Sequence, residues 1–273
     1  MFSHTLFTLP FSLIAMFLAS GGLPEGRVIF WILIALIAGR NGANALNRWV
    51  DRKFDARNPR TSTRHLPSGQ IKPQEVLWLT AICYVIFVFA AWQISWICFV
   101  LSPIALVLFT LYSYTKRFTW ACHIVLGITC ALAPVATWLA VTGNLNSLIP
   151  WIIGIVVVLW IAGFDIIYGT QDIEFDRQQG LFSIPARFGF QNALWIARAF
   201  HVIMVLLLIA LYYLSPLGYT YLFGVLLSAV LLFIEHYMVD PTHRKKMNVA
   251  SYHLNQVISV ILLTVVTMDV FFI

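Results

Sequence analysis

Long apolar runs, separated by short breaks of glycine, proline and charged residues, make up most of the chain. A transmembrane helix needs about 20 consecutive, mainly apolar residues, so each long run is a candidate span. Nine such runs are found, at residues 5–20, 28–50, 76–93, 96–113, 119–141, 148–170, 191–214, 217–238 and 254–273. The pattern predicts an all-α membrane protein in which nine transmembrane helices form one bundle, a single domain over residues 1–273.

The composition agrees with an intramembrane protein. Of the 273 residues, 60% are hydrophobic and only 10% are charged, whereas soluble domains carry about 25% charged residues. The apolar start, residues 1–20, lacks a basic n-region, so we interpret it as the first helix and not as a signal peptide. The formal charge of +6 does not predict nucleic acid binding, because that function needs a basic surface and these basic residues lie between apolar spans.

Basic residues are distributed unevenly between the predicted loops. Thirteen of the 17 lysines and arginines fall in every second loop. They are Arg52, Lys53, Arg57, Arg60, Arg64, Lys72, Lys116, Arg117, Arg177, Arg187, Arg244, Lys245 and Lys246. Because cytoplasmic loops are enriched in Lys and Arg, the N-terminus is predicted to be cytoplasmic and the C-terminus to lie outside. The expected location is the inner (cytoplasmic) membrane, with multiple passes.

One face of the second predicted span is polar. Five polar residues there fall within an arc of about 80° on a helix that turns about 100° per residue. They are Arg40, Asn44, Asn47, Asp51 and Asp55, and we call them the first stripe. An ionisable group at membrane depth costs at least about 2.5 kcal/mol, so the stripe is expected to face a polar cavity.

A second stripe with the same arc lies four spans later, on the same predicted side of the membrane. Its residues are Asp165, Tyr168, Asp172 and Asp176. Each stripe on its own is also consistent with solvated loop carboxylates that neighbouring arginines and lysines neutralise. Two stripes that both begin inside apolar spans favour a functional site that opens to the cytoplasm.

The residue types in the stripes suit a magnesium site. Clustered carboxylates repel one another unless a cation intervenes, and oxygen ligands from Asp and Asn suit Mg²⁺, which is usually completed by water and substrate phosphate. Lys53, Lys116, Arg117 and the loop arginines are expected to supply positive charge for a diphosphate. Tyr112 lies one helical turn before Lys116 at the end of the fourth span, although such residues are also common interface anchors.

These motifs resemble those of the UbiA superfamily of intramembrane aromatic prenyltransferases. The segment from Asn47 to Thr61, continuing to Gly69, resembles the first aspartate-rich motif of that family. The segment from Asp165 to Asp176 resembles the second, and Tyr112 to Lys116 matches the Tyr/Lys element between them. The resemblance covers nearly the whole chain.

The resemblance implies that Mg²⁺ ions between the motifs hold a polyprenyl diphosphate whose tail runs along a lipid-facing opening. The implied metal ligands are Asn47, Asp51, Asp55, Asp172 and Asp176. The implied catalytic residues are Asp51, Asp165, Asp172 and Tyr112, with Tyr112 near the reacting allylic carbon. The implied substrate-binding residues are Arg40, Asn44, Lys53, Lys116, Arg117 and Tyr168.

The acceptor is expected to be an aromatic carboxylic acid. Within the superfamily, the chain looks similar to the 4-hydroxybenzoate polyprenyltransferases of ubiquinone synthesis. Arg40 is expected to pair with the acceptor carboxylate, although a helix–helix hydrogen-bonding role is the alternative. The segment Gly180–Gly189 resembles instead the branch of the futalosine route to menaquinone, which implies 1,4-dihydroxy-6-naphthoate as the alternative acceptor.

A secondary transporter is the alternative from a different functional class. Transporters are also polytopic, with charges near the midplane and internal repeats. Their sites lie near the bilayer centre, whereas both stripes here end at one predicted face, so the enzyme is favoured. Two histidines within predicted spans, His123 and His201, are interpreted as core or interface residues.

Overall fold

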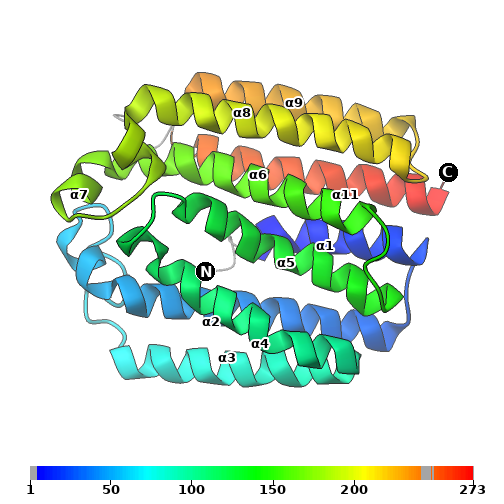
Figure 1. Ribbon diagram of the computed structural model, residues 1–273, viewed down its shortest axis with the longest axis horizontal. Coiled ribbons are helices and arrows are strands. Elements are labelled where there is room, and N and C mark those ends of the chain that lie inside the picture. The colour runs from blue at the N-terminus through cyan, green and yellow to red at the C-terminus, as the bar shows by residue number, and fades with distance from the viewer. Residues whose placement is uncertain (1–4, 241–246, 248, 273) are drawn as a thin grey trace.

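The computed structural model of the protein describes residues 5–240, 247 and 249–272, and their long helices run side by side in one bundle (Figure 1). The long helices are α1 (Thr5–Ser20), α2 (Gly26–Arg57), α3 (Pro73–Ile94), α4 (Trp96–Leu111), α5 (Cys122–Thr142), α6 (Ile149–Gly169), α8 (Ile184–Leu214), α9 (Tyr219–Met238) and α11 (Asn255–Phe272). The short elements are the 3₁₀ turns η2 (Tyr112–Arg117) and η3 (Thr170–Asp172), the helix α7 (Ile173–Gln178) and the π-helical turn η4 (Val249–Leu254).

Each of the nine predicted spans coincides with one long helix. Among the described residues, eight helices are long and apolar enough to cross a membrane. Helix α1 is apolar but has only 16 residues, so the count of nine spans stays a prediction. The prediction of an all-α, multi-pass membrane protein is confirmed.

Helix α6 lies at the centre of the bundle and packs against both α5 and α8. Trp160 on α6 is fully buried, with its ring centroid 5.0 Å from that of Phe11 on α1. Helices α5 and α6 approach closely at Gly127, where a Cβ atom would lie 2.5 Å from the backbone oxygen of Val158. Helix α6 is thus packed closely against α5, and the second stripe begins on α6 at Asp165.

Two helices extend beyond their predicted ends. Helix α2 continues to Arg57, past the predicted end at residue 50, so the whole first stripe lies on one helix. Helix α8 begins at Ile184, before the predicted start at residue 191, because Ser183 caps it by accepting a hydrogen bond from the Ala186 amide. Gly189, with φ of 80°, then kinks α8.

The second stripe does not lie on a single helix, and here the helical arithmetic is wrong. Helix α6 ends at Gly169, the chain tightens into η3, and α7 follows. The Thr170 hydroxyl donates to the Ile167 carbonyl at 2.6 Å, which stabilises the tighter turn. Asp165 and Tyr168 therefore lie on α6, Asp172 ends η3, and Asp176 lies on α7.

The predicted cytoplasmic loops that the structure describes lie together. The α2–α3 connection, η2 and α7 lie at one end of the bundle, and the α5–α6 connection lies at the other end (Figure 1). The predicted basic residues Arg244, Lys245 and Lys246 lie outside the described residues. The orientation of these ends relative to the cytoplasm stays a prediction.

Cysteine labelling will test this orientation. Ser68 and Asn144 are both exposed, in loops at opposite ends. We expect Ser68→Cys in intact cells to react with a membrane-permeant reagent only, whereas Asn144→Cys will also react with an impermeant one. The wild-type chain, whose four free cysteines are buried or half-buried, measures background labelling. Impermeant labelling of Ser68→Cys would reverse the predicted topology.

Candidate active site

The first stripe carries a chain of polar contacts along α2. The Asn47 side-chain amide donates to Asp51 Oδ2 at 3.0 Å, and Arg117 Nη2 lies 3.5 Å from Asp51 Oδ1. One turn further on, Arg64 Nη1 donates to Asp55 Oδ1 at 2.7 Å. The first stripe is thus neutralised by arginines from η2 and from the α2–α3 connection.

The second stripe is neutralised in the same way. Arg60, from the α2–α3 connection, makes two hydrogen bonds to the Asp172 carboxylate, one of them from Nε to Oδ1 at 2.9 Å. Arg60 Nη1 also donates to the Tyr168 hydroxyl at 2.5 Å. Burial by itself would lower the pKa of Arg60, but the hydrogen bonds and charge of Asp172 outweigh it and raise the pKa above its ordinary value, so Arg60 stays charged.

Lys116 of η2 connects the two stripes. Its Nζ lies 3.9 Å from Asp176 Oδ2, which also accepts a hydrogen bond from the Ser183 hydroxyl at 2.9 Å. Lys116 also interacts electrostatically with Asp172 and with Asp51. The structure therefore brings the acidic ends of both stripes around one lysine, as the spacing of the motifs predicts.

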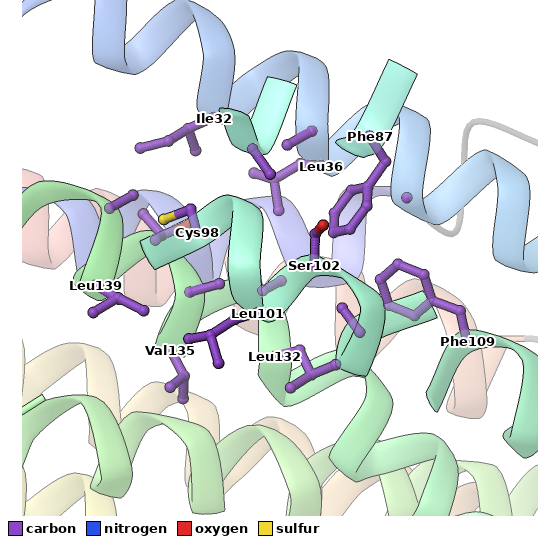
Figure 2. Close-up of a pocket in the computed structure, with 18 of the residues that line it drawn as sticks. Ile32, Leu36, Phe87, Cys98, Leu101, Ser102, Phe109, Leu132, Val135 and Leu139 are labelled. Atoms are coloured by element: carbon purple, nitrogen blue, oxygen red, sulfur yellow. The ribbon is translucent and has the colours of Figure 1, made fainter. Parts of the chain in front are cut away.

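Next to this charged cluster lies an apolar cavity of about 330 Å³ between α2, α3, α4 and α5. Figure 2 shows side chains that line it, among them Ile32, Leu36, Phe87, Cys98, Leu101, Ser102, Phe109, Leu132, Val135 and Leu139. Arg40, Tyr112 and Cys130 also line the cavity. The first stripe therefore begins in the cavity wall and ends in the charged cluster.

Arg40 lacks an anionic partner within the described residues. Its Nη1 lies 3.3 Å from Cys130 Sγ, and its Nε is buried without a hydrogen-bond partner. No carboxylate of the described chain forms an ion pair with Arg40, in contrast to Arg60, Arg64 and Arg117. A guanidinium at membrane depth is costly unless it is paired, so Arg40 is suited to bind an external anion.

The acidic residues fit a magnesium ion that is completed by a substrate. Within the residues that the structure describes, no three His, Cys, Asp or Glu side chains are grouped so that they alone could hold a metal. Mg²⁺ is usually held by one or two carboxylates together with waters and substrate phosphates. Asp51, Asp172 and Asp176, with the Asn47 amide oxygen, can provide such ligands, and all three aspartates interact with Lys116. Asp55 Oδ2 is buried without a hydrogen-bond partner among the described residues.

Some predicted site residues make no contact that supports their assignment. Lys53 is exposed on α2, and it forms no ion pair with any described residue. Asn44 is half-buried on α2 between Arg40 and Asn47. Both assignments stay predictions.

Several residues of the site were not assigned to it from the sequence. They are Arg48, Asn58, His123, Ser183 and Tyr252. Arg60 and Arg64 belong to the loop arginines that were expected to supply positive charge for a diphosphate, but their contacts with Asp172 and Asp55 were not predicted.

The chain is similar to known prenyltransferases over nearly its whole length. The model of the UbiA prenyltransferase family matches residues 8–257. A 4-hydroxybenzoate octaprenyltransferase of Aeromonas salmonicida (strain A449) is 30% identical over 246 residues, which cover 88% of this chain and 83% of the relative. An enzyme of the same name from Tolumonas auensis (strain DSM 9187 / NBRC 110442 / TA 4) is 28% identical over 242 residues, 89% of this chain and 83% of that relative.

Solved structures show the same fold. The apo structure of a UbiA homolog from Aeropyrum pernix K1 has 30% sequence identity and a TM-score of 0.88, covering 97% of this chain and 98% of that chain. A UbiA homolog from Archaeoglobus fulgidus bound to DMAPP and Mg²⁺ has 17% identity and a TM-score of 0.69, covering 96% of each chain, and this likeness shows the fold alone. The chain therefore belongs to the UbiA prenyltransferase family.

Proposed function

We propose that the protein transfers a polyprenyl group from a polyprenyl diphosphate to a phenolic aromatic acid of the 4-hydroxybenzoate type, with Mg²⁺, and releases diphosphate. One observation carries the proposal: the charged cluster around Lys116 adjoins an apolar cavity, and Arg40 lines that cavity without an anionic partner. This arrangement matches a substrate with a charged head and an apolar tail together with a second, anionic substrate.

The charged cluster is proposed to bind the diphosphate. Asn47, Asp51, Asp55, Asp172 and Asp176 would hold Mg²⁺, which when bound acts as a Lewis acid for the departing diphosphate. Lys116 and Arg117 would donate hydrogen bonds to its oxygens. The ion pairs of both basic residues with proposed metal ligands support this role: Lys116 lies 3.9 Å from Asp176 and Arg117 lies 3.5 Å from Asp51.

The apolar cavity is proposed to hold the first part of the prenyl tail. Its lining is almost entirely aliphatic and aromatic, and it excludes water that would otherwise quench an allylic cation. Tyr112, the first residue of η2, lines the cavity. This supports the proposal that its ring lies near the allylic carbon, where it would stabilise a cation.

Arg40 is proposed to bind the acceptor carboxylate. A planar guanidinium binds a carboxylate through two parallel hydrogen bonds, and Arg40 Nε has no hydrogen-bond partner among the described residues. The bound acceptor would then present its ring between Arg40 and the diphosphate site.

The relatives favour 4-hydroxybenzoate over the naphthoate alternative, because several are named 4-hydroxybenzoate octaprenyltransferases. The transporter alternative is set aside, since the chain belongs to a prenyltransferase family. The proposed location is the inner membrane, with the site open to the cytoplasm and one domain over the chain. No nucleic acid is part of this function.

Competition between the two acceptors will test the proposal. Membranes that contain the protein will be offered 4-hydroxybenzoate and 1,4-dihydroxy-6-naphthoate together with a polyprenyl diphosphate. We expect mass spectrometry to detect prenylated 4-hydroxybenzoate that is absent from control membranes. A prenylated naphthoate alone would assign the protein to the alternative reaction, and substrate uptake into vesicles without covalent change would contradict both.

A substitution in the cavity will test the position of the tail. Ala133 lines the cavity from α5, so Ala133→Phe is expected to lower kcat/KM for long polyprenyl diphosphates by about 5- to 150-fold, the equivalent of an overpacking cost of about 1–3 kcal/mol. The five-carbon DMAPP should be affected less. Ile128→Phe, on the exposed face of the same helix, is the matched control. Equal losses for short and long substrates would place the tail elsewhere.

A further inference from the structure

A buried histidine and an aspartate form a pair beside the metal site. His123 on α5 has an exposed fraction of 1%, and its Nδ1 lies 2.7 Å from Asp165 Oδ2 on α6. The Asp165 side chain is 28% exposed. The aspartate thus has one oxygen fixed by the buried ring while part of its side chain remains accessible.

The histidine ring is held in one place. A Cβ atom at Gly169 would lie only 3.1 Å from His123 Cε1, so the ring packs directly on the end of α6. His123 Nε2 is buried and has no hydrogen-bond partner among the described residues. The contact with Asp165 engages Nδ1 and fixes it as the donor to an ionised aspartate.

Asp165 lies within electrostatic range of both proposed substrate subsites. It interacts electrostatically with Lys116, in the proposed diphosphate site, and with Cys130. Cys130 lines the cavity and contacts Arg40, the proposed acceptor site. The ring carbon that is prenylated must lie between these two proposed sites, and Asp165 is a carboxylate that interacts with groups of both.

We propose that Asp165 accepts the proton that the aromatic ring loses. His123 is the positioning residue, because its hydrogen bond holds the Asp165 carboxylate in one orientation. The inference rests on the proposed function. Diphosphate leaves with the electron pair of the C–O bond. The allylic carbon then forms a C–C bond to the ring carbon that is ortho to the phenolic hydroxyl. The C–H bond at that ring carbon then breaks, its electron pair restores the aromatic ring, and the proton forms an O–H bond with Asp165.

The test compares acceptors with hydrogen and with deuterium at the reacting ring positions. When a general base is efficient, loss of the proton is fast and the isotope does not change the rate. A general base contributes about 10²–10⁴-fold, so Asp165→Asn should lower kcat by about 100-fold or more and produce a primary isotope effect on kcat. His123→Ala should do the same more weakly, because misplacement of a catalytic group costs up to about 100-fold.

Conservative variants separate positioning from packing. The side-chain amide of Asn can replace the Nδ1 donor, so His123→Asn should recover much of the kcat that His123→Ala loses and reduce the isotope effect. His201→Ala is the matched control, since His201 is also buried but bonds to His236 on the far side of α6. The His201→Ala variant should show no isotope effect. Thermal unfolding in detergent will show whether each variant is folded.

The outcomes distinguish the two proposals. Purified protein will be incubated with geranyl diphosphate, Mg²⁺ and labelled or unlabelled 4-hydroxybenzoate. Wild-type protein that forms no C-prenylated acid would contradict the proposed function. If the wild type is active, equal rates with both isotopes in folded Asp165→Asn and His123→Ala variants, or wild-type kcat in either, would overturn the inference about the pair.

Discussion

Asp172→Asn is expected to reduce turnover by at least about 10²–10³-fold while the protein still folds. The substitution removes one negative ligand of the proposed Mg²⁺ site and the carboxylate to which Arg60 makes two hydrogen bonds. Since the bound metal stabilises the charge that develops on the departing diphosphate, the loss should affect kcat and not only substrate binding. Asp51→Asn, which removes a proposed ligand of the first stripe, should have a similar effect.

The measurement is diphosphate release by purified variants at saturating Mg²⁺ and substrates. Glu174→Gln is the matched control, because Glu174 lies two residues from Asp172 on α7 and its side chain is 82% exposed, with a single 4.0 Å contact to Arg177. It should behave as wild type. Rates near wild type for folded Asp51→Asn or Asp172→Asn would show that the carboxylate in question is not needed for catalysis.

Arg40→Lys is expected to weaken apparent binding of the aromatic acid by about 1–3 kcal/mol, or roughly 5- to 150-fold in KM. Lysine keeps the positive charge but cannot reproduce the two parallel hydrogen bonds of a guanidinium to a carboxylate. Because Arg40 lines the cavity wall and forms no ion pair with any carboxylate of the described chain, the KM for the prenyl diphosphate should change much less.

Steady-state kinetics with each substrate varied in turn will check this prediction. Arg27→Lys is the matched control, because Arg27 lies at the other end of α2. Among the described residues, its side chain forms hydrogen bonds only with Gln93. An unchanged acceptor KM for Arg40→Lys, or equal losses for both substrates, would assign Arg40 to helix packing.

The apolar pattern located the long helices because burial in a membrane requires continuous apolar length. It did not locate their polar ends. Helix α2 continues through Asp51 and Asp55 to Arg57, in a stretch where charged residues interrupt the apolar run. The second stripe was predicted as one helical face, but a 3₁₀ turn at Thr170–Asp172 divides it, and local hydrogen bonds of this kind leave no periodic signal.

The acidic residues of the site were predictable and most of their partners were not. The regular spacing of Asp51, Asp172 and Asp176 in the sequence predicted that they belong to a site. Arg60 and Asp172 are 112 residues apart, and the contact depends on the path of an irregular connection. His123 was interpreted as a core residue, and it is buried, but its hydrogen bond to Asp165 depends on the tight packing of α5 on α6, which spacing alone does not specify.

The most direct test of the proposed function is product formation by the purified protein from geranyl diphosphate and 4-hydroxybenzoate, with and without Mg²⁺. We predict a C-geranylated acid by mass spectrometry, formed together with an equal amount of diphosphate and only when Mg²⁺ is present. Release of diphosphate with geraniol as the only organic product, or no reaction with any aromatic acid offered, would contradict the proposed function.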